Sequence, residues 1–216
     1  MSARELGFFL SVVASWKEGR KEPVVGRVKE ELRDPFAVLV ATILSLRTRD
    51  IVTSRAFDHL WQLAKTPNEI LALSIGATEK AIRPVGFYKT KAKSLKAICE
   101  QLLSRHGGGV PNDLDALLKL PGVGRKTANL VLIEGFGQEG ICVDTHVHRI
   151  LNWWGFAKTS SPDETEQFLR RKLPRKWWMP INGLLVSFGQ EVCLPAAPKC
   201  RECPLAKRCP YPGKRA

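Results

Sequence analysis

The sequence lacks any apolar run of about 18 residues, the minimum length for a membrane-spanning helix. It also lacks a convincing alternating β pattern, internal repeats, low-complexity segments and a flexible linker. The apolar stretch at its N-terminus is short and is followed by Ser11, Ser15 and Lys17, which argues against a secretory signal. These absences predict that the chain has no transmembrane helix, and they favour a cytoplasmic protein with reduced cysteines and no membrane partner.

Acidic residues are also few. Asp and Glu total 21 against 34 Lys and Arg, which gives a formal net charge of +13. This surplus indicates a polyanionic partner, although a merely basic soluble protein would show it too. An acidic membrane surface is a weaker interpretation because no basic amphipathic helix stands out.

Helical periodicity covers nearly the whole chain and predicts an all-α fold of about ten short helices. Asp34 and Pro35 form a helix start before Phe36–Leu44, a segment that is apolar all round and should be a central buried helix. Asp50 is expected to cap the next helix. Thr66–Glu69 has the pattern of a capping box with proline at the first helical position.

The segment from Leu120 to Ala128, LPGVGRKTA, is the most informative in the chain. A leucine-rich helical stretch runs into Pro121 and Gly122, which a helix does not easily continue through. The glycines permit a tight turn and close approach by a ligand, and a second helix begins at once. The first turn of a helix presents N–H groups that suit a phosphate. Lys126 is therefore expected beside a bound nucleic-acid backbone.

Four cysteines fall within seventeen residues near the C-terminus, with gaps of six, two and five residues. Thiolates at this spacing can converge on one centre. Structural zinc usually uses two close pairs, whereas only one close pair is present, and a [4Fe–4S] cluster accepts four separate thiolates. Spacing leaves both metals open, and a disulfide framework is disfavoured in a cytoplasmic chain. The four candidate metal ligands are Cys193, Cys200, Cys203 and Cys209.

These segments, in this order, resemble the endonuclease III family of helix-hairpin-helix DNA glycosylases. Leu120–Ala128 matches its hairpin, Val143–His146 its catalytic aspartate segment, and the cysteine spacing its iron–sulfur loop. The resemblance implies a six-helix barrel domain at residues 28–138. It implies a discontinuous helical iron–sulfur cluster domain at residues 1–27 and 139–216, holding a [4Fe–4S] cluster.

The resemblance also implies a base excision repair enzyme that removes oxidised pyrimidines from duplex DNA. Lys126 and Asp144 would be its catalytic residues. The Lys126 amine would attack the sugar of a base swung out of the duplex and form a covalent imine. Asp144 would stabilise positive charge on the sugar, and β-elimination would then nick the strand. On its own, Asp144 before Thr-His at a helix start also reads as an N-cap.

Two further segments resemble the family's DNA-probing loops, and they contain Arg47, Phe87 and Lys91. Phe87 would fill the gap left by the extruded base, Arg47 would contact the opposite strand, and Lys91 a phosphate. Better-known members carry glutamine in place of Arg47, leucine in place of Phe87, and an acidic residue near Gly109. The remaining expected DNA contacts are Leu120, Gly122, Val123, Gly124, Arg125 and His146.

Three alternatives remain at this point. A mismatch-specific glycosylase of the same superfamily is the nearest, although such relatives usually lack the lysine. A non-catalytic helix-hairpin-helix DNA-binding protein would explain the charge, and a small electron carrier would explain the cysteines. The favoured interpretation predicts a monomer that binds double-stranded DNA with a damaged base or an abasic site, nucleoid-associated if the cell is prokaryotic.

Overall fold

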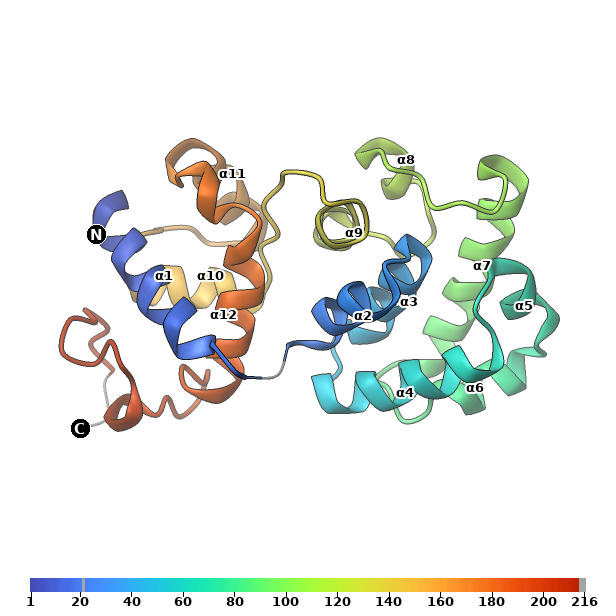
Figure 1. Cartoon of the computed structure of the whole chain (residues 1–216), viewed down its shortest axis with the longest axis horizontal. Helices are drawn as coiled ribbons and strands as arrows, with labels where there is room; N and C mark the ends of the chain where they lie inside the picture. The colour runs from blue at the N-terminus through green and yellow to red at the C-terminus, as the bar shows by residue number, and fades with distance from the viewer. Residues whose placement is uncertain (21, 214–216) are drawn as a thin grey trace. The chain divides into compact units, whose positions relative to one another are not determined.

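The computed structural model describes residues 1–20 and 22–213, and all regular structure in them is helical (Figure 1). The predicted all-α class is therefore confirmed. Two compact units make up the chain: residues 24–138, called the hairpin unit below, and residues 1–23 with 139–216, called the cysteine unit. The domain boundary predicted at residue 28 falls inside α2 (Val24–Leu32), which lies wholly in the hairpin unit. None of the described helices combines the length and apolar character needed to cross a membrane.

The hairpin unit is built around α3 (Pro35–Ser45), as its all-round apolar sequence predicted. Asp34 caps this helix by accepting a hydrogen bond from the Phe36 N–H, and Pro35 occupies its first turn. All residues from Phe36 to Leu44 are buried. They can be, because α3 packs against helices on several sides, namely α2, α4, α7 and α9. The other helices of this unit are α4 (Asp50–Leu63), α5 (Pro67–Ala72), α6 (Ile75–Ile82), α7 (Tyr88–His106), α8 (Leu114–Leu118) and α9 (Arg125–Phe136).

Of the helix starts predicted for α5 and α4, the first is confirmed and the second is wrong. The capping box at Thr66 is confirmed, because its side chain accepts from the Glu69 N–H and the Glu69 carboxylate accepts from the Thr66 N–H. The prediction that Asp50 caps α4 is wrong. Arg49 occupies the cap position, and the Asp50 carboxylate instead accepts from the N–H of Val24, at 3.0 and 3.1 Å. Burial raises the pKa of Asp50, while the Val24 hydrogen bond opposes that rise.

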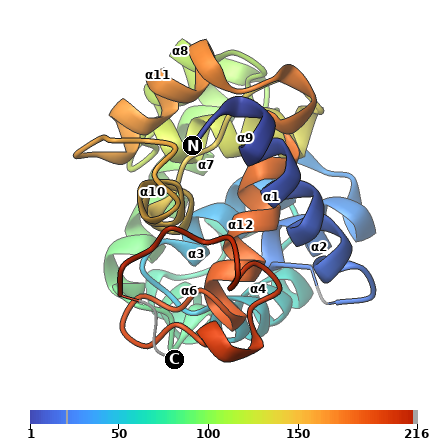
Figure 2. The ribbon, with the colours of Figure 1, turned by 90° about the vertical axis from the view of Figure 1, so that its left-hand side faces the viewer.

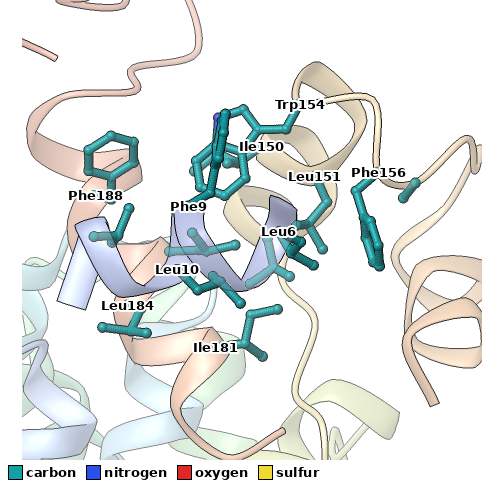
Figure 3. Packing of buried hydrophobic residues seen from close by; sticks show 14 of the residues in the cluster. Leu6, Phe9, Leu10, Ile150, Leu151, Trp154, Phe156, Ile181, Leu184 and Phe188 are labelled. Atoms are coloured by element: carbon teal, nitrogen blue, oxygen red, sulfur yellow. The ribbon is translucent and has the colours of Figure 1, made fainter. Parts of the chain in front are cut away.

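The cysteine unit has its own apolar core, formed where α12 (Pro180–Glu191) packs against α1 (Ala3–Lys17) and α10 (Thr145–Trp153). Figure 2 shows α1 and α12 side by side in this unit. Leu6, Phe9 and Leu10 of α1 point into the core (Figure 3), where the Phe9 ring meets Trp154 edge to face with centroids 5.0 Å apart. The other helices of the unit are α11 (Pro162–Lys172) and the 3₁₀ helices η1 (Arg175–Trp177) and η2 (Cys200–Glu202).

Candidate active site and cysteine loop

The hairpin joins α8 to α9 through a turn in which only one glycine needs its conformational freedom. Gly122 has φ of 75°, and a Cβ there would also come within 3.4 Å of the Ser94 hydroxyl. The Val123 N–H donates to the Leu120 carbonyl at 3.1 Å and closes the turn. Gly124 is the N-cap of α9 at φ of −92°, and nothing lies within 4 Å of a Cβ built on it. The backbone at the start of α9 is therefore open to close approach by a ligand.

The hairpin residues predicted to contact DNA are divided between surface and core. Gly122, Gly124 and Arg125 are exposed. Leu120 and Val123 are buried, at 2% and 6% exposure. Their side chains hold the turn onto the hairpin unit, so any contact that they make with DNA has to involve the backbone.

Lys126 occupies the first turn of α9 and is half-buried. The helix that carries it is firmly anchored, because Thr127, Ala128 and the five residues after them are buried and α9 packs along α3. A side chain on such a helix is positioned more accurately than one on a loop. The N-terminal end of α9 also presents the positive end of the helix dipole on the side where an anion would bind.

Asp144 lies in the cysteine unit and caps α10. Its Oδ1 accepts hydrogen bonds from the N–H groups of His146 and Val147, both at 2.9 Å. The capping interpretation is therefore confirmed. The carboxylate remains half-exposed, and because both bonds end on Oδ1 its orientation is fixed by the helix that follows.

His146, in the first turn of α10, packs closely against α12. A Cβ added at Gly189 would come within 2.5 Å of the His146 Nδ1 and within 3.1 Å of its Cβ. The side chain is half-buried. This packing gives His146 a structural role in the cysteine unit, and the predicted DNA contact stays a prediction.

Arg47 and Phe87, the expected probing residues, are both exposed, Phe87 by 62%. Both adopt left-handed backbone conformations, with φ of 51° and 58°. The Arg47 guanidinium lies 5.7 Å from the centroid of the Phe87 ring, within the range of a cation–π contact. The two loops therefore present their tips together, a pairing that the sequence could not show.

Lys91 requires a correction. We predicted that it contacts a phosphate, but the side chain is 6% exposed and its ammonium group points into the hairpin unit. It donates to the carbonyl oxygens of Leu44 and Leu46 and to the hydroxyl of Thr48, at 2.7, 2.6 and 3.0 Å. Burial lowers the pKa of Lys91 to about 8. All three donors of the ammonium are directed at oxygens of the protein, which leaves none for DNA.

The four candidate ligand cysteines line one small pocket in the cysteine unit. All four are half-buried, and three of them pack against the apolar core. Within residues 1–20 and 22–213, no three His, Cys, Asp or Glu side chains meet closely enough to hold a single metal ion. Burial raises the pKa of Cys193 to about 12, and the neighbouring Arg149 opposes that rise.

Sequence reasoning missed the side chains that frame this pocket. The Trp153 and Tyr211 rings stack with centroids 4.1 Å apart and both line it. Arg149 lies over the Trp153 ring and donates a hydrogen bond to the Cys193 carbonyl. No local sequence motif marks these residues. Arg149 and Trp153 are brought to one face by the helical spacing of α10, and Tyr211 reaches Trp153 from a segment far along the chain.

Comparison with known proteins identifies the family. The family model described as "HhH-GPD superfamily base excision DNA repair protein" matches residues 40–175. Endonuclease III of Thermotoga maritima is 46% identical over 182 residues, which cover 84% of this chain and 85% of that protein. The chain belongs to the endonuclease III family. Endonuclease III of Bacillus subtilis is 38% identical, with 84% of each chain covered.

Solved endonuclease III structures match this member of the family closely. A trapped endonuclease III–DNA covalent intermediate is 32% identical and superposes with a TM-score of 0.86 over 97% of this chain and 96% of that one. A thermostable thymine-DNA glycosylase is 26% identical, with a TM-score of 0.82 over 97% and 96%. The predicted helix-hairpin-helix glycosylase fold is confirmed. The chain is a base excision repair enzyme, a DNA glycosylase and AP lyase.

Proposed function

We propose that this enzyme removes oxidised pyrimidines from duplex DNA through a covalent imine on Lys126. The observation that carries the proposal is the placement of Lys126 in the first turn of a rigidly packed helix, directly after a hairpin whose backbone is open at Gly124. A phosphate bound at that helix start would fix the neighbouring sugar relative to the amine. The trapped covalent endonuclease III–DNA complex supports the same chemistry in a relative.

The proposed reaction begins when the neutral Lys126 amine attacks C1′ of the extruded nucleotide, and the damaged base leaves with the electrons of its glycosidic bond. Opening of the sugar ring at O4′ gives an imine between C1′ and the lysine nitrogen. Loss of the C2′ proton then expels the 3′ phosphate, which cuts the strand. We assign Asp144 the stabilisation of positive charge on the sugar, supported by its fixed, half-exposed carboxylate.

A panel of duplexes, each with one defined lesion, tests this substrate class. Incubation with borohydride should trap the protein covalently on duplexes with oxidised pyrimidines, because reduction of the imine makes the bond permanent. Efficient excision of a mispaired normal thymine with little action on oxidised pyrimidines would instead support a mismatch-specific glycosylase. The structural similarity to a thymine-DNA glycosylase makes that the alternative to examine first.

We further propose that the four cysteines of the pocket hold a [4Fe–4S] cluster. Support comes from the four half-buried cysteines that line one pocket, since a [4Fe–4S] cluster accepts four separate thiolates. Bound there, the cluster would cross-link the loop between residues 193 and 209 and so present its exposed Lys199, Arg201 and Lys207 to phosphates. The monomeric state and cytoplasmic location remain predictions.

Replacing one ligand should remove the metal. Cys203→Ala is expected to lose most of the bound iron and the broad visible absorption, measured by metal analysis and spectroscopy of the protein as purified. Cys99→Ala is the matched control, because Cys99 is buried in α7 and belongs to the hairpin unit. Stoichiometric zinc in the wild-type protein would overturn the cluster assignment.

A further inference from the structure

Lys91, at the start of α7, binds the C-terminal end of α3. It lies in the first turn of α7, and its ammonium reaches the Leu44 carbonyl of α3 and the Leu46 carbonyl just beyond that helix. The last carbonyl groups of a helix accept no hydrogen bond from within that helix. A cation at this end can donate hydrogen bonds to them, and it also interacts favourably with the negative end of the helix dipole. The buried ammonium therefore fixes the point at which the chain leaves α3 toward Arg47.

The hydroxyl of Thr48 connects this cap to the second loop. It accepts a hydrogen bond from Lys91 Nζ and another from the Gly86 N–H, each at 3.0 Å, and donates to the Leu46 carbonyl at 3.2 Å. One donor and two acceptors exhaust the capacity of a hydroxyl group. Lys91 and Thr48 thus form a joint between the loop at residues 46–49 and the loop at residues 83–87.

The joint lies directly behind the two exposed tips. Arg47 precedes Thr48, and Phe87 follows Gly86. The loops also touch through their backbones, since a Cβ on Gly86 would lie only 2.8 Å from the Arg47 carbonyl oxygen. Arg47 and Phe87 both have positive φ, a conformation that costs free energy for residues other than glycine and persists only where the surroundings impose it.

We infer that Lys91 is a positioning residue for base extrusion: through Thr48 it holds Arg47 and Phe87 in the one arrangement that enters the DNA stack. The inference rests on the proposed function, in which these two tips fill the gap left by the damaged base. Loss of the joint should therefore impair excision of an intact damaged base, which requires extrusion. It should spare strand cleavage at a preformed abasic site, where no base has to be moved.

The same helix supplies a matched control. Lys96, also in α7, donates to the carbonyls of Ile70, Leu71 and Leu73 at the C-terminal end of α5. Lys96 therefore caps a helix end as Lys91 does, but the loop that follows α5 contains neither Arg47 nor Phe87. A general loss of stability should appear in both substitutions, whereas a loss of extrusion should appear only at Lys91.

The experiment compares Lys91→Met, which keeps the apolar stem without the donors, with Lys96→Met. Single-turnover base excision by Lys91→Met should fall by about tenfold to a hundredfold, since small displacements of positioning groups cost that much. Cleavage of a preformed abasic site should stay within about twofold of wild type. A 2-aminopurine placed beside the lesion should show a reduced fluorescence rise on binding. Lys96→Met should excise, cleave and unstack as wild type does.

Thr48 keeps the inference testable if Lys91→Met does not fold. Thr48→Val, which removes the hydroxyl, should repeat the selective loss of excision, and Thr48→Ser should restore it. Equal losses of excision and abasic-site cleavage, or wild-type excision by both Lys91→Met and Thr48→Val, would overturn the inference. The proposed function fails separately, if the wild-type protein itself does not excise oxidised pyrimidines.

Discussion

Lys126→Arg should abolish covalent trapping on DNA and lower abasic-site cleavage by about a thousandfold or more, as expected for loss of a nucleophile. Arginine keeps the positive charge at the start of α9 but carries no nucleophilic amine. The substitution therefore separates a reacting amine from a phosphate contact. Trapping is measured by gel electrophoresis after borohydride reduction, and DNA affinity by titration with an uncleaved duplex.

Lys119→Ala is the control for this test, because Lys119 is an exposed lysine at the end of α8, in the same hairpin. Its loss should weaken DNA binding modestly at low salt and leave trapping intact. Retention of wild-type cleavage by Lys126→Arg would contradict the nucleophile assignment. Loss of trapping in Lys119→Ala as well would instead show that trapping follows DNA binding by the hairpin, so that its loss in Lys126→Arg would not identify the nucleophile.

Gly189→Ala should destabilise the protein by about 1–3 kcal/mol, the usual cost of forcing extra volume into a packed site. The added Cβ would meet the His146 ring at 2.5 Å, and His146 follows Asp144 at the start of α10. Either α12 or α10 has to move, so we also expect reduced excision activity from a displaced Asp144. The measurements are the midpoint of denaturant unfolding and the single-turnover excision rate.

Gly183→Ala is the matched substitution in the same helix. A Cβ there would meet only the flexible end of Lys17, at 3.5 Å, so the change should be neutral or stabilise by up to about 1 kcal/mol through helix propensity. Equal stability changes in the two variants would show that the contact with His146 does not limit the packing of α12.

The sequence predicted the structural features that depend on interactions between residues a few positions apart. Asp34 and Thr66 cap the helices that follow them, and the turn at Gly122 needs only its own neighbours. These features could be inferred because capping and turn chemistry act over three or four positions. The all-round apolar character of Phe36–Leu44 likewise fixed its burial, since no face of that segment is suited to water.

Errors arose where a polar side chain finds partners far along the chain. Asp50 looks like a cap for its own helix but bonds to Val24, 26 residues earlier. Lys91 sits in a basic segment that suggests a solvated face, yet its acceptors lie more than 40 residues away. Periodicity could not distinguish Lys91 from the exposed Lys89, because both lysines lie in the first turn of the same helix and the sequence there allows either one to face solvent.

The close contact between Gly86 and the Arg47 carbonyl has a consequence for how this enzyme can diversify. The spacing of the two loops is set by backbone atoms and by the Thr48 hydroxyl, and not by the side chains at positions 47 and 87. Those two side chains can therefore be exchanged by single substitutions while the frame that carries them stays the same. Substitutions at these two positions can therefore change the lesion preference while the residues that carry out the repair chemistry stay the same.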